Sequence, residues 1–178
     1  MSLCGAAVVG TPAWAHRLSP AELPKLGFIA EFAGKRRLIQ RERLLQQWAE
    51  FYPRTLRPRL ALGRFRAETL DWWNTIDPTH YGAVLGGEPA GGRITGFLRP
   101  GTATIYTEKI DPRLLVDLRL RPDEEGNVEI FRRFWSFTTT DPTLAPAPLV
   151  YADLMATGDG RCIETAKLVF EQIVRADA

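Results

Sequence analysis

The segment Thr102-Ala103-Thr104-Ile105-Tyr106-Thr107 follows the turn residues Arg99-Pro100-Gly101 and consists mainly of β-branched and aromatic side chains. Such a run, bounded by a proline–glycine turn, predicts a β-strand. Residues 60–66 and 128–135 carry apolar and basic side chains in strand-like patterns and are predicted to be strands as well. The middle of the chain is therefore expected to form a sheet.

Helices are predicted on both sides of these strands. Residues 79–94 are rich in small side chains and are expected to form a helix with close backbone packing. Residues 114–120 are interpreted as a short helix running into a strand, and residues 149–151 as a short apolar strand. A final helix is predicted from an apolar stripe at helical spacing, formed by Ile163, Ala166, Val169, Phe170, Ile173 and Val174. With about four strands, the pattern predicts an α+β fold.

The N-terminal third of the chain is predicted to form a smaller, basic unit. Residues 26–39 read as a β-hairpin, and residues 41–52 have the apolar spacing of a helix that Pro53 would end. An arginine-rich connector follows, so a domain boundary is expected near residues 53–58. The predicted organisation is an irregular segment at 1–25, a basic hairpin and helix at 26–57, and a mixed α/β domain at 58–178.

Charge is distributed unevenly along the chain. The net charge is +2, but residues 31–66 hold ten lysines and arginines against three glutamates. Guanidinium groups can bind two phosphate oxygens at once, so this excess favours a surface that faces nucleic acid. A solvated helix face explains the same pattern equally well. The candidate nucleic-acid-binding residues are Lys35, Arg36, Arg37, Arg41 and Arg43.

Composition and motifs exclude several other classes of protein. The 178-residue chain is 45% hydrophobic and 25% charged, as a folded domain is, and its longest uncharged apolar stretch, residues 3–15, is too short to cross a bilayer. Cys4 and Cys162 lie far apart, which favours a reducing cytoplasm. The chain has no phosphate-binding loop, and His16 and His80 lack metal-ligand spacing. We therefore expect no cofactor and no metal.

One set of carboxylates leaves a catalytic alternative open. Glu88, Asp117, Glu129 and Asp153 fall on or beside predicted helices and strands, and carboxylates gathered from such elements can hold a divalent ion for phosphodiester hydrolysis. The basic residue expected two positions after a strand glutamate is missing after Glu129. Surface carboxylates are the simpler interpretation, and a metal-dependent nuclease using Glu88, Asp117 and Glu129 is the alternative function.

Four blocks of sequence resemble a known family. They are LGRFRAETLDWW at 62–73, YGAVLGGEPAGGRITGFLRPGTATIYTE at 81–108, LRLRPDEEGNVEIFRRFW at 118–135 and PLVYADLMATGDGRCIETAKLVFEQI at 148–173. Together they resemble the bacterial AbiE-type abortive-infection antitoxins, the transcriptional regulators of type IV toxin–antitoxin systems. The resemblance implies a winged helix-turn-helix followed by a mixed α/β domain shaped like a degenerate restriction-endonuclease fold.

The resemblance also implies function. The hairpin at 26–39 would be the wing, with Lys35, Arg36 and Arg37 at its tip, and most of the helix-turn-helix is expected to be lacking because only about 25 residues precede it, where roughly three helices are needed. The expected protein is a non-enzymatic antitoxin that binds operator DNA, stays off membranes and counteracts a nucleotidyltransferase-like toxin without a stable complex. A stand-alone interaction domain is a third alternative.

Overall fold

The computed structural model describes residues 24–32 and 35–176. Most of the predicted irregular segment at 1–25, together with Cys4 and His16, lies outside these residues, as do Ala33 and Gly34 at the predicted hairpin tip. The chain divides into two compact units, one ending at Trp48 and one beginning at Ala49.

The first unit contains the predicted hairpin. Strand β1 (Ile29–Phe32) pairs antiparallel with β2 (Lys35–Leu38). Phe28 is buried at the base of the hairpin, and its carbonyl accepts a hydrogen bond from the amide of Ile39 at 2.8 Å. The prediction of a hairpin within residues 26–39 is confirmed.

Helix α1 (Arg41–Thr55) begins in the first unit and ends in the second. The predicted stop at Pro53 is wrong, because Pro53 lies inside the helix. A helical proline removes one backbone donor, and here the amide of Leu56 still bonds to the carbonyl of Tyr52 at 3.1 Å. The expected connector beyond it instead contains a short helix, α2 (Arg57–Leu60).

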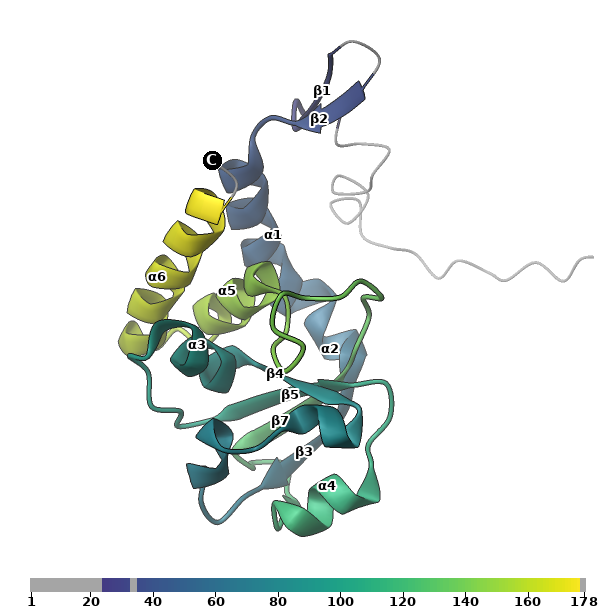
Figure 1. Cartoon of the computed structure of the whole chain (residues 1–178), viewed down its shortest axis with the longest axis vertical. Coiled ribbons are helices and arrows are strands. Elements are labelled where there is room, and N and C mark those ends of the chain that lie inside the picture. The colour runs from purple at the N-terminus through teal and green to yellow at the C-terminus, as the bar shows by residue number, and fades with distance from the viewer. Residues whose placement is uncertain (1–23, 33–34, 177–178) are drawn as a thin grey trace, which may run out of the picture. The chain divides into compact units, whose positions relative to one another are not determined.

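The second unit is built on a five-stranded mixed sheet (Figure 1). Its strands are β3 (Ala61–Arg66), β4 (Ala83–Gly86), β5 (Ala103–Thr107), β6 (Arg121–Pro122) and β7 (Val128–Arg132). They lie in the order β4-β5-β7-β3-β6, with β5 and β7 parallel and the other pairs antiparallel. The strands predicted near 60–66, 102–107 and 128–135 are confirmed, and the α+β class with them.

Helices cover both faces of this sheet. Figure 1 shows α3 (Gly87–Thr95), α5 (Ala147–Ala156) and α6 (Gly160–Ala176) on one side and α4 (Pro112–Asp117) on the other. The core between sheet and helices includes fully buried aliphatic side chains of Leu85, Ile105, Ile130, Val150 and Leu154. The predicted final helix is confirmed as α6, and the helix predicted within 114–120 corresponds to α4.

Two predicted elements are wrong. Residues 79–94 do not form one helix: a short 3-10 turn (Pro78–Tyr81) leads into β4, and α3 starts only at Gly87. Gly87 has φ +49°, and a Cβ there would lie 2.6 Å from Oγ1 of Thr104, so this strand-to-helix turn needs glycine. Residues 149–151, expected to be a strand, belong to helix α5.

Candidate functional site

The predicted nucleic-acid-binding residues begin on the hairpin of the first unit. Lys35 and Arg37 are exposed on β2, and alternation of side chains along a strand places them on the same face. Arg36 pairs with Glu31 in the register of the hairpin. Three of the four residues of β2 are therefore cations.

Two more cations follow in the first turn of α1. Arg41 and Arg43 are both exposed, and they are separated from β2 only by Ile39 and Gln40. The Arg43 guanidinium lies 5.6 Å from the centre of the Phe28 ring and donates to Oε1 of Gln40 at 3.0 Å. The structure therefore places Arg43 against the base of the hairpin, so that hairpin and helix start present their cations from one compact unit.

The carboxylates of the nuclease alternative are dispersed. Glu88 is buried at the start of α3, where it accepts hydrogen bonds from the amide of Gly101 and the hydroxyl of Thr102, both at 2.7 Å. Asp117 accepts a hydrogen bond from the Tyr81 hydroxyl at the surface. Within residues 24–32 and 35–176 no three His, Cys, Asp or Glu side chains are placed to hold a metal ion. The nuclease alternative has no support in this arrangement.

Glu129 and Asp153 do come together, but an arginine lies between them. Arg57 of α2 donates to Glu129 at 2.7 Å through Nη2 and to Asp153 at 3.3 Å through Nε. Its guanidinium also lies 4.2 Å from the centre of the Phe131 ring. The two carboxylates are therefore occupied in neutralising a partly buried cation, which satisfies the rule that buried charges are paired.

A pair of tyrosines extends this contact into the core. Asp153 accepts a hydrogen bond of 2.8 Å from the Tyr106 hydroxyl, and that hydroxyl lies 2.7 Å from the hydroxyl of Tyr52. Burial raises the pKa of Asp153 to about 6, although Arg57 and Tyr106 both favour its charged form. We call Tyr52, Arg57, Tyr106, Glu129 and Asp153 the Arg57 network.

The Arg57 network connects α1, α2, β5, β7 and α5. Sequence reasoning identified its two carboxylates as possible metal ligands, counted Arg57 among the surface cations, and missed the role of both tyrosines. The partners of Arg57 are 72 and 96 residues away along the chain, so no local pattern pointed to the pairing. Every residue of the network makes at least one hydrogen bond to another member, so the network links these elements to one another.

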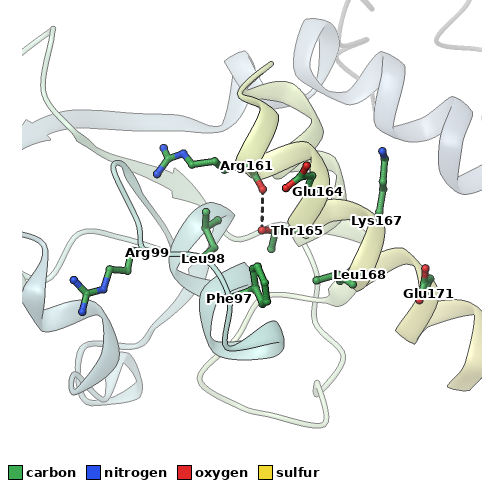
Figure 2. Close-up of a pocket in the computed structure, with 9 residues that line it drawn as sticks. All are labelled: Phe97, Leu98, Arg99, Arg161, Glu164, Thr165, Lys167, Leu168 and Glu171. Carbon is green, nitrogen blue, oxygen red and sulfur yellow. Dashed lines mark hydrogen bonds between the residues drawn. The ribbon is translucent and has the colours of Figure 1, made fainter.

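A hollow of about 630 Å³ lies between residues 97–99 and α6 (Figure 2). Its apolar side chains include Phe97, which is 82% exposed, and Leu168, which is 39% exposed. Charged side chains surround them: Arg99, Arg161, Glu164, Lys167 and Glu171. None of these residues was singled out from the sequence as a site.

Comparison with known proteins identifies the family. No curated protein and no solved structure matches the chain. In the part that the structure describes, no helix is both long and apolar enough to span a bilayer. A family model described as transcriptional regulator, AbiEi antitoxin, type IV toxin–antitoxin system matches residues 37–175. As the four sequence blocks predicted, the protein belongs to the AbiEi antitoxin family of type IV toxin–antitoxin transcriptional regulators.

Proposed function

We propose that this protein is the antitoxin and transcriptional regulator of a type IV toxin–antitoxin pair, acting in the cytoplasm, and that its first unit binds duplex DNA. The observation that carries this proposal is the group of exposed cations on β2 and the first turn of α1, in a chain of a regulator family. The DNA contacts are assigned to Lys35, Arg36, Arg37, Arg41 and Arg43.

These cations are suited to phosphates rather than to base edges. In the proposal the hairpin of β1 and β2 acts as a wing, which lies along the DNA backbone. Phosphate contacts supply affinity and orientation, whereas sequence is read by hydrogen bonds in the grooves. We expect these five residues alone to give affinity in the non-specific range of about 10⁻⁴–10⁻⁶ M at physiological salt.

Fluorescence anisotropy across a salt series tests the assignment. Duplexes carrying the protein's own promoter and a scrambled sequence are titrated with wild type and with a variant in which Lys35, Arg36 and Arg37 are replaced by alanine. Loss of three phosphate contacts reduces the slope of log affinity against log salt by up to about 0.9 for each contact. A control variant in which the exposed Lys109, Arg121 and Arg132 are replaced by alanine has the same net charge as the hairpin variant. It should keep the wild-type slope. An unchanged slope in the hairpin variant removes the hairpin from the DNA surface.

The second unit is proposed to carry the antitoxin activity. We further propose that it is a non-catalytic relative of restriction-endonuclease folds. Its mixed sheet with helices on both faces supports this, as does Arg57 occupying Glu129 and Asp153. It would counteract a nucleotidyltransferase-like toxin without a stable complex. Growth rescue on co-expression with the neighbouring toxin gene, together with no recovery of toxin on affinity-tagged antitoxin, is the expected result.

A further inference from the structure

Phe97 lies exposed in the turn that follows α3. Helix α3 ends at Thr95 and is capped by Gly96, whose φ of +71° is the left-handed conformation that glycine adopts readily. Leu98, the next residue but one, is buried, and a Cβ on Gly92 would lie 2.5 Å from its carbonyl oxygen. The loop therefore packs directly on α3, on both sides of Phe97. Phe97 and the 39% exposed Leu168 both line the hollow beside α6, so they place apolar surface together in water, and such surface can mark a contact with another molecule.

The neighbouring face of α6 carries charges of alternating sign. Along the helix they are Arg161, Glu164, Lys167 and Glu171, with Leu168 among them (Figure 2). Arg161 pairs with Asp159 and Glu171 with Arg175. Glu164 and Lys167 are exposed, and neither has an ion-pair partner in the described part of the chain.

This order of charges is complementary to itself. When two identical helices meet antiparallel across a two-fold axis, residue i of one contacts residue j of the other, and j contacts i. An axis beside Thr165 and Ala166 places Glu164 opposite Lys167 of the second copy. The same axis places Arg161 one residue away from the position opposite Glu171 of the second copy. This offset of about 1.5 Å along the helix is within reach of an arginine side chain, so both kinds of pair are attractive in one register. A partner of uniform charge would meet a like charge at one of these positions.

We propose that the face formed by Phe97, Leu168 and the charged residues of α6 is a self-association surface, on which two copies of this chain pair their α6 helices antiparallel. The exposed rings of Phe97 and the side chains of Leu168 from both copies form the apolar centre, and the hollow beside α6 gives the opposing ring room. Complementary charges at the edge of an apolar contact fix its register. The inference does not rest on DNA binding.

Sedimentation equilibrium of the full chain without DNA, from low micromolar to several hundred micromolar, measures the association. Wild type is expected to form a dimer. Glu164→Lys brings lysine against lysine, and Lys167→Glu brings glutamate against glutamate. Each change acts twice across the two-fold axis, so each variant alone should raise the dimer Kd by about tenfold or more.

Mixing the two single variants is the decisive measurement. A Glu164→Lys chain and a Lys167→Glu chain complement each other at both positions, so their mixture should dimerise with about the wild-type Kd, although each variant alone associates more weakly. The double variant, with the two charges exchanged, should recover the wild-type Kd. Phe97→Ala should also raise the Kd by about tenfold, because truncating a central aromatic anchor costs at least that much.

Matched variants elsewhere on the surface control for general effects of charge and exposure. Glu124→Lys and Lys109→Glu reverse exposed charges, and Val116→Ala truncates an apolar side chain that is 74% exposed on α4. All three should associate as wild type does. Wild type that remains monomeric at every concentration overturns the proposal. Single variants that associate normally, or a mixture that stays monomeric, overturn it as well.

Discussion

The phenol oxygens of Tyr52 and Tyr106 lie 2.7 Å apart in the interior of the protein. Tyr52 belongs to the last turns of α1 and Tyr106 to strand β5, which lies between β4 and β7, so this hydrogen bond attaches the end of α1 to the sheet. The Tyr106 hydroxyl continues to Asp153, which is 3% exposed and shares Arg57 with Glu129. A buried polar chain of this kind stabilises the fold only while every member keeps its partner.

Tyr106→Phe should lower the free energy of unfolding by about 1–3 kcal/mol, because Tyr52 and Asp153 each lose a partner in a buried place. Tyr81→Phe is the matched control: its hydroxyl bonds to Asp117 at the surface, where water replaces the lost group. That change should stay within about 0.5 kcal/mol of wild type. Urea unfolding measures both, and equal effects of the two variants would contradict a structural role of the Arg57 network.

Asp153 should give the fold a distinctive pH dependence. Burial raises its pKa to about 6, so the folded protein holds this proton more tightly than the unfolded chain, whose aspartates titrate near about 4. The contribution of Asp153 to stability is therefore fully present below about pH 4 and is lost as the pH rises through about 6.

Comparison with Asp153→Asn isolates this contribution from other carboxylates. Asp77, Asp111, Asp123 and Asp159 have pKa values lowered chiefly by hydrogen bonds from neighbouring side chains, and they act in the opposite direction in both proteins. The stability of wild type minus that of the variant should fall between about pH 4 and pH 6. A difference that is flat or rises over this range would mean that Asp153 stays charged in the fold.

Two helical glycines should respond oppositely to alanine. At Gly92 in α3 a Cβ would lie 2.5 Å from the Leu98 carbonyl oxygen and 3.1 Å from the Trp73 ring, so Gly92→Ala must displace backbone and should cost about 1–3 kcal/mol. Gly160, the first residue of α6, has open space around it. Gly160→Ala should leave stability unchanged or raise it by up to about 1 kcal/mol, since alanine is the better helix former. Thermal unfolding of the pair checks this, and similar melting temperatures would argue against close packing at Gly92.

Sequence patterns predicted those helices and strands whose local sequence is typical of only one kind of secondary structure. Strands β5 and β7 are rich in β-branched and aromatic residues, and α6 carries a clear apolar stripe. Helix α5 was missed because almost every residue from Leu149 to Leu154 is buried, so its sequence has no polar face to reveal a helical period. The turn at Gly86 and Gly87 was missed because small residues suit a strand end, a tight turn and a packed helix alike.

The same distinction between local and tertiary information applies to the sites. Exposed cations on β2 and α1 were identified because charge excess is a local property of the sequence. The Arg57 network joins residues from five separate elements. The proposed self-association surface combines residues of α6 with Phe97, which lies more than 60 residues earlier in the chain. Such arrangements follow from tertiary contacts, which a single sequence read segment by segment does not specify.

DNA binding and toxin neutralisation should be separable by mutation. The variant with Lys35, Arg36 and Arg37 replaced by alanine changes only the first unit, whereas the buried core of Leu85, Ile105 and Ile130 belongs to the second. Surface substitutions away from special contacts change stability by only about 0.5 kcal/mol, so the second unit should stay folded.

Expressed from an unrelated promoter, this variant should still rescue growth against the toxin as wild type does, while a reporter under the protein's own promoter loses repression. The variant lacking Lys109, Arg121 and Arg132 should keep both activities, because it loses the same charge from exposed positions outside the first unit. Gly92→Ala should instead reduce both in parallel, by lowering the amount of folded protein. If the hairpin variant loses growth rescue at wild-type protein levels, the first unit takes part in neutralisation and the proposed division of labour is wrong.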